Sequence, residues 1–229
     1  MSFSLIIPAA ANKQECVDNM LLPKAFKLNK HGVPLCIEAA MSVDTSLFDR
    51  IYITILKLHD DLFGVYYMLM HHIKRLGLNA NVIVIDEPTK SQAETVYKTI
   101  CHANIATGGI FIKDADCSFT ADIYNQNGIV VYPLEKLTLV DPQHKSYVAV
   151  DDMQYITNTI EKRVIDHYFN AGGYCFENVN DFVNYYLELE NESNLYLSHI
   201  VYAMLLDGHV FRPFMVEKYT DFDNDLCKS

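Results

Sequence analysis

The sequence has little positive charge. Its 229 residues include 18 lysines and arginines against 29 aspartates and glutamates, which gives a formal net charge of −11 at pH 7. A protein that follows the phosphate backbone of a nucleic acid needs clustered basic residues. We therefore expect no nucleic-acid partner, although a few local cations can still hold a small phosphorylated substrate.

Paired cysteines and long apolar runs are also missing. The six cysteines include no CxxC pair, which argues against a structural zinc site and is typical of reduced core residues in a cytoplasmic protein. No apolar run approaches the roughly 20 residues of a membrane helix. The opening MSFSLIIPAAA lacks a basic segment, so we expect a strand there and not a signal peptide. These features predict a cytoplasmic protein without a membrane partner.

Common catalytic signatures are absent as well. The sequence contains no G-x-S-x-G, no P-loop and no dinucleotide-binding glycine motif. No internal repeat, low-complexity segment or Pro/Gly/Ser-rich linker divides the chain. The length and the even composition predict a single domain that spans 1–229.

The first half alternates between strand and helix patterns. Apolar β-rich runs predict strands at 3–8, 50–56, 81–86 and 109–114. Helical spacing predicts helices at 33–43, 60–77 and 91–103, and 9–31 is expected to be a loop. Such alternation is typical of an α/β, Rossmann-like three-layer sandwich with a mostly parallel central sheet. Ligands of these sheets bind beyond the carboxyl ends of the strands.

The second half has a different pattern. Strands are predicted at 127–134, 145–151, 154–162 and 167–176, helices at 178–190 and 195–208, and the segments 209–216 and 218–225 close the chain. We expect the later strands to extend the first sheet and form a substrate lobe.

The segment IFIKDADCSF (110–119) places two acids at the end of a strand that is otherwise apolar. Adjacent carboxylates are costly unless a cation neutralises them. Asp114 and Asp116 are two residues apart, so in extended chain they point the same way, and hard oxygen ligands suit Mg²⁺ or Mn²⁺. An ordinary acidic turn is the alternative interpretation.

The loop after the first predicted strand carries small residues and lysines. Ala9–Ala11 allow the backbone to approach a phosphate, and Lys13 and Lys24 can supply point charges. A surface loop with solvated lysines fits the same residues.

Two other segments are candidates for substrate contact. In EPTKSQAETVY (87–97), Ser91 and Glu94 form a predicted capping box, and Gln92 is able to read a base edge by paired hydrogen bonds. Glu161 and Lys162 end a predicted strand, either as a surface ion pair or as a phosphate clamp.

Together these segments resemble the nucleotidylyltransferases with a GT-A-like fold. They are most similar to the sugar-phosphate nucleotidylyltransferase-like proteins of bacterial capsule and surface-polysaccharide loci. The matching segments run through most of the chain, in the order LIIPAAA, LLPKAFKL…GVPL, EPTKSQAETVY, IFIKDADCSF, KSYVAVD, IEKRVIDHYFNAGGYCF, LYLSHIVYAMLLDGHVF and VEKYTDFDNDL.

The resemblance implies an Mg²⁺- or Mn²⁺-dependent reaction in sugar-nucleotide and polysaccharide biosynthesis. A phosphorylated acceptor, by default a sugar 1-phosphate, would attack a nucleoside triphosphate and release pyrophosphate. It also implies a nucleotide-binding half at 1–120 and an acceptor-binding half at 121–229.

The resemblance further implies roles for individual positions. Asp116 and Asp221 would bind the metal, and Lys24, Lys162 and Asp116 would be catalytic. The nucleotide would contact Ala9, Ala10, Ala11, Lys13, Ser91, Gln92 and Asp114. The acceptor would contact Lys145, Glu161, Gly172, Gly173, Tyr196 and Ser198.

The chain departs from the family pattern in its first loop and at its end. Where the family usually has G-x-G-x-R, the sequence reads AANKQECVDN (10–19), with neither glycine nor arginine, and Asp223 replaces the glycine of D-x-G-T. Two alternatives therefore stay open: a binding protein on the same fold that has lost catalysis, and a GT-A glycosyltransferase that uses a nucleoside-diphosphate sugar. Association into a homodimer is a further expectation.

Overall fold

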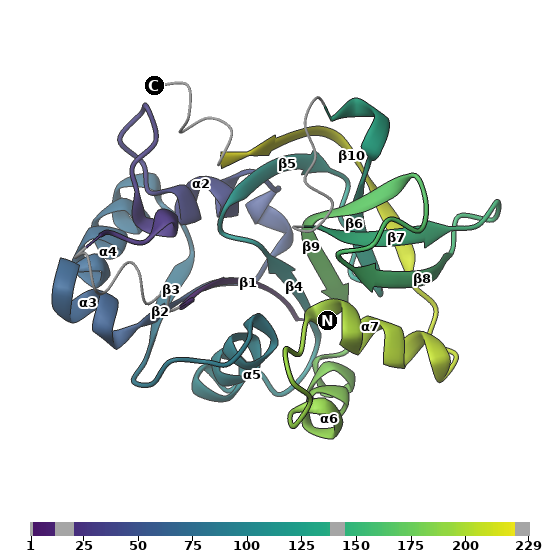
Figure 1. Ribbon diagram of the computed structural model, residues 1–229. Helices are drawn as coiled ribbons and strands as arrows, with labels where there is room; N and C mark the ends of the chain where they lie inside the picture. The colour runs from purple at the N-terminus through teal and green to yellow at the C-terminus, as the bar shows by residue number, and fades with distance from the viewer. Residues whose placement is uncertain (1, 12–20, 138–144, 223–229) are drawn as a thin grey trace.

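The computed structural model describes residues 2–11, 21–137 and 145–222, which fold around one mixed β-sheet (Figure 1). Its strand order is β3-β2-β1-β4-β9-β6-β10-β5, with β7 and β8 paired beside β9. The strands are β1 (Phe3–Ala9), β2 (Arg50–Leu56), β3 (Ala80–Ile85), β4 (Gly109–Lys113), β5 (Cys117–Ala121), β6 (Gly128–Pro133), β7 (Ser146–Val150), β8 (Ile156–Glu161), β9 (Tyr168–Phe176) and β10 (Arg212–Asp221).

The first four strands of the sheet are parallel, as the alternating sequence pattern predicts. Strand β1 pairs in parallel with β2 and β4, and β2 pairs in parallel with β3. Strand β9 runs antiparallel to β4 and β6, whereas β10 runs parallel to β6. The expected α/β fold is confirmed, and the later strands extend the first sheet as predicted.

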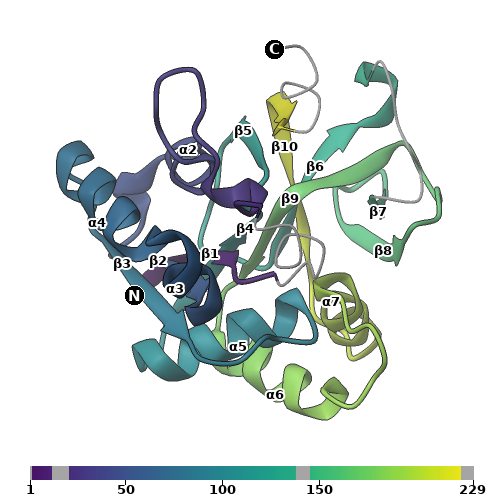
Figure 2. The same cartoon turned by 60° about the vertical axis from the view of Figure 1, so that its left-hand side comes forward.

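Helices cover both faces of the sheet (Figure 2). One face carries α2 (Leu35–Met41), α3 (Lys57–Phe63) and α4 (Val65–Leu76), and the other carries α5 (Gln92–Ala103), α6 (Val179–Leu189) and α7 (Leu197–Leu206). Strand β1 shows why both faces must be covered: Leu5 and Ile7 pack in the core with α2 and α4, whereas Ile6 packs in the core with α5. No described helix has both the length and the apolar character needed to cross a membrane.

The single helix predicted at 60–77 is wrong, because the chain forms α3 and α4 there. Gly64 closes α3 with a left-handed φ of 65°, and its N–H donates to the Asp60 carbonyl at 2.7 Å. The Asp60 side chain then accepts a hydrogen bond from Tyr66 N at 2.8 Å, which stabilises the start of α4. The predicted end is confirmed, since Gly77 terminates α4 with a φ of 66°.

Two strands, one in the middle of the chain and one near its end, are not indicated by the sequence pattern. Residues 117–121 form β5, for which no strand was expected, and most of the two closing segments merges into the continuous strand β10. These two strands pair antiparallel with Asp221 opposite Cys117. The last described residues therefore lie beside the turn that carries Asp114 and Asp116.

Candidate functional site

Two adjoining cavities open at the carboxyl edge of the parallel strands. The first has a volume of about 580 Å³ and is lined by the end of β1 and the residues after it, by the short 3₁₀ helix Lys24–Phe26, by the start of α5 and by the turn after β4. The second has a volume of about 220 Å³ and is lined mainly from β7 to β10. Gln92, Asp114 and Asp116 line both cavities, so the acidic turn is their common wall.

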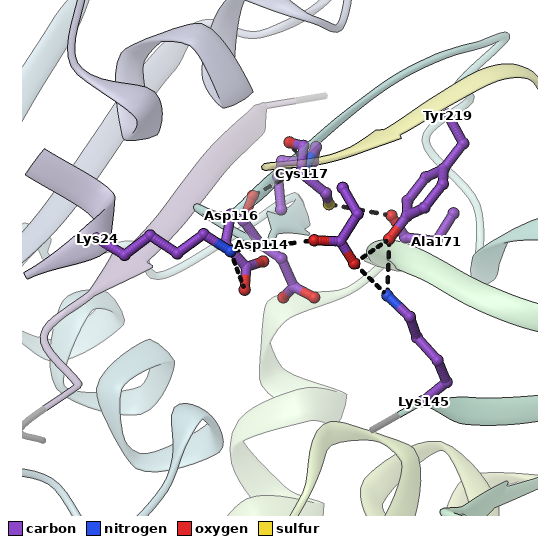
Figure 3. A network of polar contacts seen from close by, with 9 residues as sticks. Lys24, Asp114, Asp116, Cys117, Lys145, Ala171 and Tyr219 are labelled. Atoms are coloured by element: carbon purple, nitrogen blue, oxygen red, sulfur yellow. Dashed lines mark hydrogen bonds and ion pairs between the residues drawn. The ribbon is translucent and has the colours of Figure 1, made fainter. Parts of the chain in front are cut away.

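Asp116 and Asp221 lie together at this junction. The Lys24 ammonium is 3.8 Å from Asp116 Oδ2 and 4.0 Å from Asp221 Oδ1 (Figure 3). The backbone supports the same juxtaposition, because Phe222 N donates to the Asp116 carbonyl at 3.1 Å. Two acids far apart in the sequence thus share one cation.

Asp221 also contacts two residues of the second cavity, Lys145 and Tyr219. Lys145 Nζ lies 2.8 Å from Asp221 Oδ2 and donates to Tyr219 Oη at 2.8 Å. The Tyr219 hydroxyl in turn lies 3.4 Å from Asp221 Oδ2. Burial raises the pKa of Tyr219, so the hydroxyl stays protonated and available as a donor. No motif in the sequence singles out Tyr219 as a site residue.

Asp114 also lies at the junction, where it lines both cavities. Gln92 Nε2 donates to Asp114 Oδ1 at 2.5 Å, and Asp114 N donates to the Gly172 carbonyl at 2.9 Å. Burial and then the nearby charge of Asp116 raise the pKa of Asp114. The amide nitrogen of Gln92 is therefore engaged with Asp114, and its contact with a base edge stays a prediction.

Lys113 stabilises the turn that carries Asp114 and Asp116. This side chain is fully buried, and its ammonium donates to the Asp114 carbonyl at 2.9 Å, the Cys117 carbonyl at 2.7 Å and Cys117 Sγ at 3.1 Å. It also lies 4.5 Å from the ring centroid of Phe119. The three contacts use all three N–H donors of the ammonium and join the two ends of the acidic turn.

Strand β9 approaches the acidic turn more closely than a side chain would allow. Gly172 has a φ of +91°, and a Cβ at this position would lie 2.6 Å from Cys117 Sγ and 2.9 Å from Asp114 Oδ2. Gly172 lines the second cavity, and its role in shaping an acceptor site stays a prediction.

We expect Gly172→Ala to destabilise the protein more than Gly208→Ala. Gly208 has a similar φ of +87°, but among the described residues none beyond its own chain neighbours has an atom within 4 Å of the position that a Cβ would take there, so it serves as a matched control. Both variants incur the strain of a left-handed backbone, about 1–2 kcal/mol, and overpacking adds about 1–3 kcal/mol at Gly172 alone. Urea unfolding measures the difference, and equal losses in the two variants would contradict the close approach.

A carboxylate lies in the wall of the second cavity. Glu161, at the end of β8, accepts hydrogen bonds from the hydroxyls of Ser146 and Ser198. Ser198 is fully buried, so its link to the cavity is the hydrogen bond that its hydroxyl donates to Glu161. Tyr196 and Asn170 also line the cavity, and Asn170 Oδ1 accepts from the backbone N–H groups of Gly172 and Gly173.

The structure places other candidate residues away from the described cavity walls. Lys162 is exposed, with its Nζ 5.3 Å from the ring centroid of Tyr196, and its backbone N donates to the Lys145 carbonyl at 2.8 Å. Gly173 packs against the core, since a Cβ there would lie 2.4 Å from Val130 Cγ2. Ala10 packs with Leu56 and Ile85.

The remaining residues predicted to contact the nucleotide lie in different places. Ala9, Ala11 and Lys24 line the first cavity, whereas Lys13 lies outside the described residues. Ser91 lines it too and is the N-cap of α5, where its hydroxyl accepts from Glu94 N at 3.2 Å. The reciprocal half of the predicted capping box differs, because Glu94 Oε2 accepts from Lys90 N at 2.6 Å.

The residues at the junction fit a magnesium-type cation that is completed by substrate. Among the described residues, no group of three or more His, Cys, Asp or Glu side chains is arranged to hold a metal ion. Mg²⁺, however, usually takes one or two protein carboxylates and fills its coordination with water and substrate phosphates. Asp116 and Asp221 already share one cation, Lys24, so the donor set and its placement suit such an ion.

No protein-family model and no curated protein sequence matches the chain. Solved structures do resemble it. A nucleoside-diphosphate-sugar pyrophosphorylase from Vibrio cholerae RC9 gives a TM-score of 0.80 at 16% identity, over 98% of this chain and 100% of that chain.

Two other structures extend the comparison. An inositol-1-phosphate CTP transferase from T. maritima gives a TM-score of 0.69 at 16% identity, over 97% of this chain and 89% of that one. A UDP-glucose pyrophosphorylase complexed with UDP-glucose gives a TM-score of 0.68 at 11% identity, over 97% of this chain and 93% of that chain. The chain therefore has the α/β fold found in sugar nucleotidyltransferase structures.

Proposed function

We propose that the protein is a nucleotidylyltransferase that joins a nucleoside triphosphate to a phosphorylated small molecule, by default a sugar 1-phosphate, and releases pyrophosphate. The observation that carries this proposal is the junction of two cavities at Asp116 and Asp221, with a lysine from each cavity directed at Asp221. The two cavities suit two substrates that must meet at one reacting phosphorus.

The first cavity is assigned to the nucleoside triphosphate. It is the larger one, it lies beyond β1 and β4, and Lys24, Lys27 and Lys90 contribute cations to its wall. The backbone at Ala9 and Ala11 and the N-terminus of α5 offer N–H donors for phosphate or base. The second cavity, with Lys145, Glu161 and Asn170, is assigned to the acceptor.

Repulsion between two anions is the main obstacle to this reaction. A phosphate nucleophile is already ionised, so the site needs alignment and positive charge more than a general base. Asp116 and Asp221 would hold Mg²⁺ or Mn²⁺, which supplies charge neutralisation at the α-phosphate. Lys24 would offset charge on the leaving pyrophosphate, and Lys145 would orient the acceptor phosphate. Few cations are needed, which suits a chain with a net charge of −11.

A pyrophosphate-release assay tests the proposal. CTP, UTP, GTP and dTTP are each supplied with Mg²⁺ and a panel of sugar 1-phosphates and other phosphorylated acceptors. Pyrophosphate release that requires both substrates supports it. Nucleotide binding by calorimetry without turnover would favour a binding protein, and release of a nucleoside diphosphate from a nucleotide sugar would favour a glycosyltransferase. A cytoplasmic place in surface-polysaccharide synthesis is part of the same proposal.

We expect Lys162→Ala to raise the KM for the acceptor several-fold and to change kcat little. Its exposed ammonium lies 5.3 Å from the ring centroid of Tyr196, a residue in the wall of the acceptor cavity, and would attract the acceptor phosphate without touching the reacting atoms. Arg163→Ala, which removes the next exposed cation, is the control. An acceptor KM that stays at the wild-type value in Lys162→Ala would remove this lysine from the site.

A further inference from the structure

The carboxylate of Asp221 is shared by two lysines that belong to different cavities. Its Oδ1 faces Lys24 of the first cavity at 4.0 Å, and its Oδ2 faces Lys145 of the second at 2.8 Å. Lys24 also lies 3.8 Å from Asp116 Oδ2. Figure 3 shows the ammonium groups of Lys24 and Lys145 directed toward the carboxylates at the junction of the two cavities.

These two carboxylates are the groups assigned to the divalent cation. An ammonium and a metal ion that use the same oxygens compete, because each neutralises the charge that attracts the other. Lys24 and Lys145 therefore neutralise the charge of Asp116 and Asp221 in place of the cation while no substrate is bound. Each is also the lysine placed to meet a phosphate of the substrate on its own side.

Because the same carboxylates face both the lysines and the proposed metal site, the geometry points to a charge exchange, in which a divalent cation replaces the two lysines at Asp116 and Asp221. This inference rests on the proposed function. Lys24 and Lys145 neutralise Asp116 and Asp221 in the substrate-free protein, and the divalent cation displaces them. Lys24 then pairs with the triphosphate and Lys145 with the acceptor phosphate. The chain thus binds the metal weakly by itself and tightly together with the phosphates that receive the displaced lysines.

Linkage makes this coupling reciprocal. If a triphosphate raises the affinity for the metal by some factor, the metal raises the affinity for the triphosphate by the same factor. Each lysine becomes available to its substrate as the metal takes its place at the carboxylates. Removal of a lysine should therefore increase the affinity for free metal, an effect that mere damage to the fold does not produce.

The experiment measures the dissociation constant for Mn²⁺ without nucleotide, from the free Mn²⁺ signal in electron paramagnetic resonance. Wild type is compared with Lys24→Met, Lys145→Met and the control Lys30→Met, which removes an exposed lysine outside the walls of both cavities. We expect Lys24→Met and Lys145→Met to bind Mn²⁺ roughly three- to tenfold more tightly than wild type. Lys30→Met should match wild type.

Two further outcomes separate this inference from the proposed function. If Lys24→Met and Lys145→Met bind Mn²⁺ no more tightly than wild type, while Asp116→Asn weakens binding, the metal site stands and the charge exchange is overturned. If Asp116→Asn and Asp221→Asn bind Mn²⁺ as well as wild type, the metal assignment in the proposed function fails and the exchange fails with it.

Discussion

Asp116→Asn is expected to reduce pyrophosphate release by on the order of 10²–10³-fold, the effect of losing one group that stabilises charge in a transition state. The substitution keeps the size and shape of the side chain but removes half of the paired negative charge at the junction of the two cavities. The Asp116 side chain is 57% exposed, so the fold should be unaffected. Steady-state kinetics with saturating Mg²⁺ and both substrates, together with circular dichroism, measure the two effects separately.

The control for this variant is Asp152→Asn, which removes an exposed carboxylate from the turn between β7 and β8. It should match wild type in both measurements. Turnover by Asp116→Asn within a few-fold of wild type would show that this carboxylate does not hold the cation. Loss of turnover with a lowered melting temperature would point to a structural role for Asp116.

The edge that carries the site could be predicted from the sequence, because it depends on a local pattern. Alternating strands and helices require a parallel sheet, and the loops after β1, β3 and β4 then lie at one edge. The pairing of Asp116 with Asp221 could not be worked out in this way. It depends on the antiparallel pairing of β10 with β5, and β5 was not expected to be a strand at all. Only the family resemblance placed these two acids together.

The break between α3 and α4 shows the limit of periodicity. The apolar spacing continues through Gly64, so the pattern indicates one helix. The break depends on a left-handed residue and on the side chain of Asp60, which caps the second helix. An acid followed four residues later by a glycine was the available signal, but a single glycine inside a helical pattern does not by itself require a break.

The sequence contains a signal for the buried position of Lys113. In the strand GIFIK, Phe111 and Lys113 are two residues apart and so lie on the same face, and Phe111 is a core residue. A lysine on a core face needs acceptors for its donors. The carbonyls of the acidic turn provide them, which explains how two acids can follow directly after a buried strand.

We expect Lys113→Met to lower the free energy of unfolding by about 2–4 kcal/mol. Methionine fills a similar volume, so packing should persist, but the Asp114 and Cys117 carbonyls lose their donor. A buried acceptor left without a partner costs about 1–3 kcal/mol, and relief from burying a charge offsets part of that sum. Urea unfolding measures the change.

Lys136→Met is the matched control, because Lys136 is exposed and its ammonium also lies over an aromatic ring, 5.8 Å from the centroid of Tyr132. Substitutions at exposed positions usually change stability by about 0.5 kcal/mol or less, so the two lysines should differ clearly. Equal, small losses would mean that the acidic turn keeps its shape without the buried ammonium. The positions of Asp114 and Asp116 would then depend on the hydrogen bond from Gln92 and on the contact with β9. Strand β4 would precede the turn without stabilising it through Lys113.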